Sequence, residues 1–228
     1  MKTIVTVLAA AAATAAAPGS LIITGIFDGP LPGGDPKGIE LYATAAITDL
    51  SIYGLETASN GGASGGATEA TLPADSMAAG EFYYVSNGND GDFAQWFGFA
   101  ANFSGPSGGA VNHNGDDVLL LYQNGAVIDS FGVLGVDGSG EPWETLDGWA
   151  YRNNGVSANG GTFDAADWSY SGRNAWDGDD NFNGGSDNGT NATATPPFPA
   201  GTFQIPEPTA TLLGGLGLGL LFLLRRKK

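Results

Sequence analysis

Short runs in which apolar and polar residues alternate recur along the chain, and turn residues separate them. An alternation with period two predicts a strand with one buried face, and clusters of Gly, Pro and Asn predict the turns between strands. The sequence therefore predicts strands over residues 21–27, 39–42, 48–55, 81–85, 148–152 and 167–170.

The segment from Val118 to Phe131 carries the clearest local pattern, because two apolar runs flank Asn124-Gly125. This dipeptide tolerates the positive φ angles that a two-residue type I′ turn requires at both positions. The first run is almost wholly apolar, which is typical of a strand buried on both faces. We expect a central hairpin with the cross-strand pairs Tyr122–Val127, Leu121–Ile128, Leu120–Asp129 and Val118–Phe131.

Residues 92–99 have the spacing of an amphipathic helix, since Phe93, Trp96 and Phe97 fall at i, i+3 and i+4. Asp90 or Asp92 is suited to cap its start. We expect Trp96 to fill the core rather than to bind a ligand. With 38 Gly and 12 Pro, the chain as a whole predicts short strands joined by many turns, as in a β-sandwich or barrel.

The order of these segments resembles the lamin-tail domain family. The matching motifs are GIELY at 38–42, TDLS at 48–51 followed by Tyr-Gly-Leu, a Leu-Pro segment at 72–80 before a strand, GDDVLLL at 115–121 and IDSF at 128–131. The resemblance covers residues 21–177, and the chain departs from the family at 60–68 and 93–113. It implies an all-β, immunoglobulin-like β-sandwich that is secreted or displayed at the cell surface, and it carries over no catalytic residue.

The first 17 residues carry one cation, Lys2, then an apolar run and an alanine tract. This is the layout of a secretory signal peptide, which we expect to be a helix cut after Ala15 or Ala17. The sandwich domain is then expected at 18–177, followed by a flexible acidic and Pro-rich linker at 178–205.

Residues 206–228 combine a Pro-Glu-Pro triplet, an uncharged run from Thr209 to Leu224 and four terminal cations. The uncharged run corresponds to about 24 Å of helix, slightly less than the roughly 30 Å core of a bilayer. It predicts a single transmembrane helix, and cations confined to one flank place the C-terminus in the cytoplasm. An ordinary membrane anchor is one interpretation of this segment.

The same order of features also resembles the PEP-CTERM sorting signal of bacterial envelope proteins. The resemblance rests on Pro206, Glu207, Pro208, Arg225, Arg226, Lys227 and Lys228. It implies recognition by a membrane-embedded exosortase and attachment to the membrane until the helix is removed. It also implies delivery to the cell envelope, the outer surface or the extracellular matrix of a bacterium.

Charge narrows the possible partners. All but one of the 24 Asp and Glu residues lie between residues 18 and 205, against three basic residues, Lys37, Arg152 and Arg173. Nucleic acid is therefore not an expected partner, because binding to it depends on neutralising phosphates with Lys and Arg. The chain has no Cys, which excludes disulfides, thiolate metal sites and cysteine nucleophiles.

Residues 177–190 form the densest acidic loop. Oxygen-bearing side chains at alternate positions, with Gly184 where the chain must bend, fit the first half of a calcium loop. Thr190, however, stands where a bidentate Glu is expected. The hypothetical Ca²⁺ ligands are Asp177, Asp179, Asn181, Asn183 and Asp187, and a solvated linker without metal is the alternative. No other cofactor is expected.

Four tryptophans, Trp143, Trp149, Trp168 and Trp176, gather in the last third of the chain. Exposed indole faces beside carboxylates are suited to stack on sugars, which makes these residues a hypothetical glycan site. Such rings also fill the core of a sandwich that has no disulfides, and we favour that interpretation.

No catalytic residue is assigned. Asp116-Asp117 could supply the paired carboxylates of a glycosidase, but turn capping is the favoured role of these residues, and His113 is the chain's single histidine. We therefore expect a non-catalytic surface or matrix module with an adhesive or structural role. A carbohydrate-binding protein of the exopolysaccharide matrix is the alternative, and a small secreted hydrolase is a third.

Overall fold

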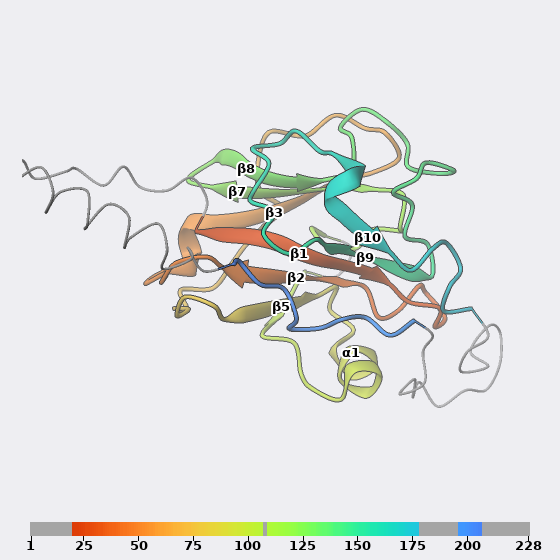
Figure 1. Cartoon of the computed structure of the whole chain (residues 1–228), viewed down its shortest axis with the longest axis horizontal. Coiled ribbons are helices and arrows are strands. Elements are labelled where there is room, and N and C mark those ends of the chain that lie inside the picture. Colours follow the sequence, from red (N-terminus) through yellow and green to blue (C-terminus); the bar gives the residue numbers. More distant parts are fainter. Residues whose placement is uncertain (1–19, 107–108, 178–195, 207–228) are drawn as a thin grey trace, which may run out of the picture.

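The computed structural model describes residues 20–106, 109–177 and 196–206, which form two stacked β-sheets with little helix (Figure 1). The larger sheet has the strand order β10-β9-β1-β2-β5-β6, and the smaller one has the order β4-β3-β7-β8. The strands are β1 (Leu21–Asp28), β2 (Gly38–Ala43), β3 (Tyr53–Ala58), β4 (Ala70–Thr71), β5 (Phe82–Ser86), β6 (Phe103–Ser104), β7 (Val118–Gln123), β8 (Ala126–Phe131), β9 (Gly148–Arg152) and β10 (Trp168–Tyr170). The predicted all-β class is confirmed.

One predicted strand begins later than expected. Within residues 48–55, a short 3₁₀ helix at Leu50–Ile52 precedes β3. The side chain of Asp49 accepts a hydrogen bond from the backbone N–H of Ser51 at 2.8 Å and so caps this turn. Such local side-chain bonds compete with strand pairing, which explains why the alternating pattern misled the prediction there.

The predicted hairpin between β7 and β8 is present, with a shift in its register. Asn124 and Gly125 have φ angles of 50° and 78°, as the type I′ turn requires. The predicted pair Tyr122–Val127 is confirmed, but Ile128 then forms a β-bulge, so the pairs beyond it are Leu121–Asp129, Leu120–Ser130 and Leu119–Phe131. The predicted pairs Leu121–Ile128, Leu120–Asp129 and Val118–Phe131 are wrong by one residue. The bulge moves the Asp129 side chain to the face of Leu121, which lies between the sheets.

The six-stranded sheet is buried on both faces. Its inner face packs against the smaller sheet through aliphatic side chains such as Ile23, Ile39 and Leu41. Its outer face carries a second cluster that is mainly aromatic, covered by α1 (Asp90–Phe97) and by residues 196–206 (Figure 1). Burial on two faces accounts for the almost unbroken apolar sequence of β1.

Helix α1 was predicted at residues 92–99 and begins and ends two residues earlier. It ends at Gly98, whose φ of 77° is the left-handed conformation that commonly terminates helices. Trp96 is 6 % exposed and packs against Trp176, with ring centroids 5.1 Å apart, so its predicted place in the core is confirmed.

Among the residues that the structure describes, no helix has both the length and the apolar character needed to span a bilayer. The predicted signal helix at 1–17 and the predicted transmembrane helix at 209–224 lie outside these residues.

Candidate functional site at the C-terminal strap

Residues 196–206 run as an extended segment across the outer face of the six-stranded sheet, in blue in Figure 1. We call this segment the C-terminal strap. The flexible acidic and Pro-rich linker predicted at 178–205 includes all of these residues except Pro206. Instead, Phe198 and Phe203 are buried at 9 % and 2 % exposure, so the strap is packed as part of the domain. The rest of the predicted linker, 178–195, lies outside the described residues.

The strap is anchored by its two phenylalanine rings. The Phe198 ring lies 5.1 Å from the ring of Phe27 and 5.4 Å from that of Tyr151, between ring centroids. The Phe203 ring lies 5.1 Å from the ring of Tyr42. A Cβ atom built on Gly25 would lie 2.3 Å from Cζ of Phe198, so the absence of a side chain at position 25 of β1 makes the space for this ring.

Hydrogen bonds attach the strap to the domain at both of its ends. At its start, the indole N–H groups of Trp149 and Trp176 both donate to the carbonyl oxygen of Pro196, each at 2.9 Å. Near its end, Gln204 donates its backbone N–H to Oδ1 of Asn154 and accepts the N–H of Gly155, again at 2.9 Å each. The strap is therefore bonded to the domain as far as Gln204.

The middle of the strap meets Glu40 and Tyr151. The backbone N–H of Gly201 donates to Oε2 of Glu40 at 2.7 Å. The next two N–H groups, of Thr202 and Phe203, donate to the Tyr151 hydroxyl at 3.0 and 2.9 Å. Three consecutive backbone donors of the strap thus have partners on the sheet, which a buried segment of backbone requires.

Glu40 is a carboxylate buried without a basic partner. It is fully buried on β2, and its Oε1 accepts from the Thr24 and Tyr151 hydroxyls at 2.7 and 2.8 Å, while Oε2 accepts from the Tyr84 hydroxyl at 2.9 Å. With Gly201, these four neutral donors solvate the carboxyl. Burial raises the pKa of Glu40, and the hydrogen bonds oppose that shift.

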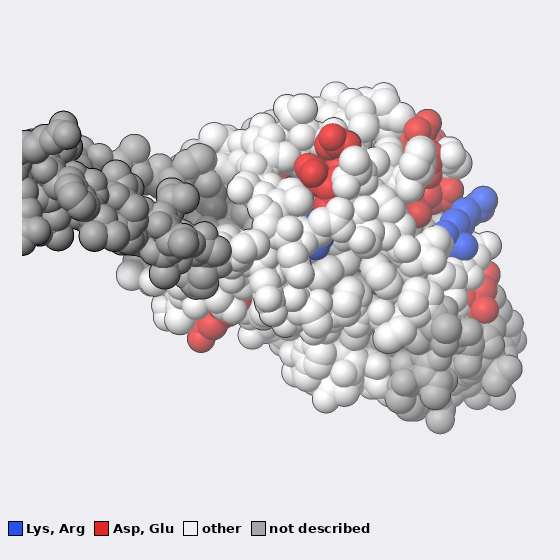
Figure 2. Space-filling model, in the orientation of Figure 1, with Lys and Arg blue, Asp and Glu red and all other residues white. Residues whose placement is uncertain are grey.

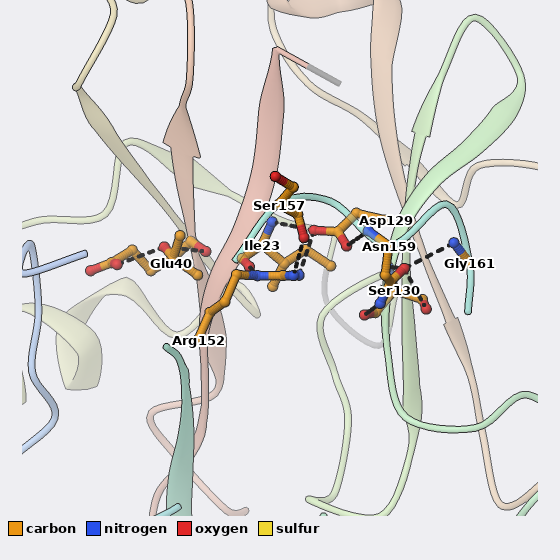
Figure 3. A network of polar contacts seen from close by, with 9 residues as sticks. Ile23, Glu40, Asp129, Ser130, Arg152, Ser157, Asn159 and Gly161 are labelled. Carbon is orange, nitrogen blue, oxygen red and sulfur yellow. Dashed lines mark hydrogen bonds and ion pairs between the residues drawn. The ribbon is translucent and has the colours of Figure 1, made fainter. Parts of the chain in front are cut away.

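A second buried carboxylate, Asp129 on β8 of the smaller sheet, faces the inner side of the six-stranded sheet and is paired with Arg152 of β9 (Figure 3). Nη2 of Arg152 lies 2.7 Å from Oδ2 of Asp129, and both side chains are 0 % exposed. Asp129 also accepts the N–H of Ile23, and Arg152 donates through Nε to the carbonyl of Ile23. Because β9 pairs with β1 only from Gly25 onward, these side chains satisfy the backbone groups that the strand ladder leaves open.

The four predicted glycan residues are all buried: Trp143 is 2 % exposed, Trp149 8 %, Trp168 5 % and Trp176 0 %. Trp143 packs edge-on against Phe131, and Trp168 lies under the guanidinium of Arg152 at 4.5 Å. A sugar stacks on an open ring face, and these faces are covered by protein. Their burial therefore favours the packing interpretation of these four residues over a glycan site on their ring faces.

The predicted calcium loop is described only at its first residue, Asp177, while Asp179, Asn181, Asn183 and Asp187 lie outside the described residues. In the part of the chain that is described, no group of three or more His, Asp or Glu residues is arranged to hold a metal ion.

Asp147 lies beside Asp177. Burial, and then the neighbouring carboxylate of Asp177, raise the pKa of Asp147 to about 6.

The remaining candidate groups have structural partners. Asp117 accepts the backbone N–H groups of Asn60 and Asn114 at 2.8 and 3.0 Å, which confirms its predicted role in capping turns. His113 is 1 % exposed, and burial and then the charge of Lys37 lower its pKa to about 3. His113 is therefore neutral at physiological pH and is enclosed by protein.

The surface is acidic. Of the three basic residues in the described part of the chain, Arg152 is buried against Asp129 and Lys37 is buried 3.5 Å from Asp28, whereas Arg173 is exposed. Figure 2 accordingly shows several acidic side chains and few basic ones on the visible face. Such a surface repels polyanions.

The fold and this site define an all-β protein whose last described segment is built into the domain. Residues 204–228 match the family model described as the PEP-CTERM protein-sorting motif. This motif indicates export to the cell envelope or surface of a bacterium and recognition by an exosortase-type processing enzyme. No family match supports the lamin-tail resemblance, and no curated protein and no solved structure matches the chain.

The motif and the strap overlap. The match begins at Gln204, the residue whose backbone N–H and carbonyl are both bonded to the domain, and the triplet begins at Pro206. The structure therefore leaves no free linker between the folded domain and the sorting motif. Phe198 and Phe203, two large apolar residues within a Pro-rich segment, are the sequence signal that could have identified the strap.

Proposed function

We propose that this protein is a non-catalytic module of the bacterial cell surface or extracellular matrix, exported and sorted through the exosortase route, with an adhesive or structural role. The observation that carries the proposal is the continuity of the sorting motif with the strap of the domain. Two features support a lamin-tail-like, immunoglobulin-like sandwich. They are the two-sheet architecture and the β7–β8 hairpin, whose second strand contains Asp129-Ser130. Asp117, Asp129, Glu40 and His113 are all engaged in contacts within the domain, which supports a non-catalytic role.

The positions of the two ends of the described chain support display of the domain at the cell surface. In β1, Gly25 pairs with Tyr151 of the antiparallel strand β9, so the start of β1 and the residues after β9 lie at one end of the sandwich. Gly155 there binds Gln204, so the described chain begins and ends at the same end, at the left of Figure 1. An anchor at that end leaves the other end free to face away from the membrane.

An exposed apolar loop at the far end is suited to contact a partner. The β7–β8 turn lies at the end where the described chain begins and ends, because Gln123 pairs with Tyr53, which interacts with Ser20. The chain after β8 therefore leaves at the opposite end. Its next residues include three exposed aliphatic side chains, Val133, Leu134 and Val136, at 41, 47 and 36 % exposure.

Two measurements on the full-length chain in an exosortase-containing bacterium test the sorting part of this proposal. Mass spectrometry of the mature C-terminus should show loss of the segment after the Pro-Glu-Pro triplet, and cell fractionation should place the protein in the envelope or outside the cell. Deletion of the exosortase should preserve the full-length C-terminus. Full-length protein in the cytosol of the wild-type strain would contradict the route.

The non-catalytic part is tested separately, by offering glycoside and phosphoester substrates to the purified protein. No turnover above the buffer blank is expected. Turnover that Asp116→Ala abolishes, with the melting temperature unchanged, would identify a hydrolase and reject the proposal.

A further inference from the structure

The domain binds main-chain groups of the strap that lie a few residues before the sorting triplet. The N–H groups of Gly201, Thr202, Phe203 and Gln204 are all bonded to the domain, and so is the carbonyl of Gln204. The chain remains close to the domain at the triplet itself, because a Cβ atom on Gly155 would lie 3.2 Å from Cδ of Pro206.

An enzyme that recognises a peptide in extended form bonds to the peptide's main chain and receives its side chains in pockets. In the docked strap, the backbone N–H groups from Gly201 to Gln204 are already bonded to the domain, and the Phe203 side chain is 2 % exposed. These donors and this side chain are therefore not accessible to an enzyme. The domain is also a steric obstacle, because the last backbone hydrogen bond to the domain lies two residues before Pro206. The docked state therefore competes with binding to the processing enzyme for the same backbone.

We propose that docking of the C-terminal strap restrains processing of the sorting motif, so that the exosortase acts on molecules whose strap has left the sheet. This inference rests on the exosortase route in the proposed function. When only a fraction of molecules is competent, the apparent affinity for the enzyme falls by that fraction. Substitutions that release the strap should accelerate processing, while equally disruptive substitutions elsewhere should not.

The principal test compares two Phe→Ala variants of the full-length chain in the exosortase-containing bacterium. Phe198→Ala removes a strap ring that packs against Phe27 and Tyr151. Phe163→Ala is the control for loss of a phenyl ring away from the strap, because the half-buried Phe163 packs against Phe131 and Trp143 at the edge of the other cluster. Pulse-labelling followed by mass spectrometry gives the half-time of C-terminal processing for each variant.

Phe198→Ala is expected to shorten this half-time by about tenfold, and Phe163→Ala to leave it within about twofold of wild type. Hydrogen exchange on the purified processed protein provides the second readout. The amides of Gly201, Thr202 and Phe203 should exchange faster in Phe198→Ala and at the wild-type rate in Phe163→Ala.

A milder variant covers the case in which Phe198→Ala accumulates poorly. Asn154→Ala removes the exposed side chain that accepts the N–H of Gln204 and leaves both clusters intact. We expect it to shorten the half-time by about two- to fivefold.

The outcomes separate the inference from the function on which it rests. Faster exchange of the strap amides together with an unchanged or longer processing half-time would overturn the restraint while leaving the sorting route intact. Absence of exosortase-dependent processing in the wild-type chain would reject the route itself.

Discussion

Two buried carboxylates, Asp129 and Glu40, lie against opposite faces of the six-stranded sheet, and they are stabilised in different ways. On the inner face, Asp129 is paired with the guanidinium of Arg152 and joins the smaller sheet to the larger one. On the outer face, Glu40 has four neutral donors, one of which belongs to the strap. Burial raises the pKa of both carboxyls, and the charge of Arg152 opposes that shift in Asp129 alone.

The difference indicates which contact is permanent and which is releasable. Removing one member of a buried ion pair leaves an uncompensated charge, so the Asp129–Arg152 pair opposes separation of the sheets. When the strap leaves, Glu40 loses the Gly201 N–H and keeps its three hydroxyl donors. The inner face is therefore suited to hold the sandwich together, and the outer face to hold a segment that can detach.

The largest expected effect comes from breaking the inner pair. Arg152→Ala should lower the free energy of unfolding by about 3–5 kcal/mol, because it strands the Asp129 charge between the sheets. Urea denaturation at pH 7 measures this loss. Arg173→Ala is the control, since the Arg173 side chain is 58 % exposed and its pairing with Glu144 should contribute at most about 1 kcal/mol. Equal losses in the two variants would remove the distinction between the buried pair and a surface pair.

Removal of the carboxylate on the outer face should lower the free energy of unfolding by less than removal of Arg152 does. Glu40→Ala removes the acceptor shared by Thr24, Tyr84, Tyr151 and Gly201, which should cost about 1–3 kcal/mol. The loss should be accompanied by faster hydrogen exchange at Gly201 and wild-type exchange in β7. Glu40→Gln retains an acceptor oxygen and should lose less. If Glu40→Ala instead accelerates exchange equally in β7, the outer carboxylate supports the whole sandwich and the proposed contrast between the faces fails.

The smallest expected effect is a dependence on pH. Because the folded protein raises the pKa of Glu40, it binds that proton more tightly than the unfolded chain does. The stabilisation from this proton is complete below the unfolded-state pKa and is lost as the pH rises through the folded-state pKa. The wild type should therefore gain stability relative to Glu40→Gln as the pH is lowered from 7 toward the ordinary range of Glu. If the difference in unfolding free energy between wild type and Glu40→Gln does not change with pH, the pKa of Glu40 is not raised by burial.

Local patterns predicted much of the sandwich. Asn124-Gly125 fixed the hairpin turn, and the spacing of Phe93, Trp96 and Phe97 located the helix within two residues. The bulge at Ile128 was not predictable, because the apolar sequence around it is compatible with either register. Its cause is tertiary, since it delivers the Asp129 side chain to Ile23 and Arg152.

In the candidate site, too, one part could be predicted from the sequence and the other could not. The sorting motif is a linear pattern, so its residues could be found from the order of Pro-Glu-Pro, apolar run and cations. The strap depends on contacts such as Gly25 with Phe198, which are far apart in the chain, and its composition is that of a linker. The indole N–H groups of Trp149 and Trp176 likewise find their acceptor in Pro196, which is distant from both in the chain.

That shared acceptor gives the protein a built-in optical reporter. Departure of Pro196 would expose two indole N–H groups to water together, which should shift the fluorescence emission to longer wavelength. The Trp96 and Trp176 rings, 5.1 Å apart, should contribute a coupled signal to the near-ultraviolet circular dichroism. The state of the segment before the sorting motif can thus be followed in the natural chain without a chemical label.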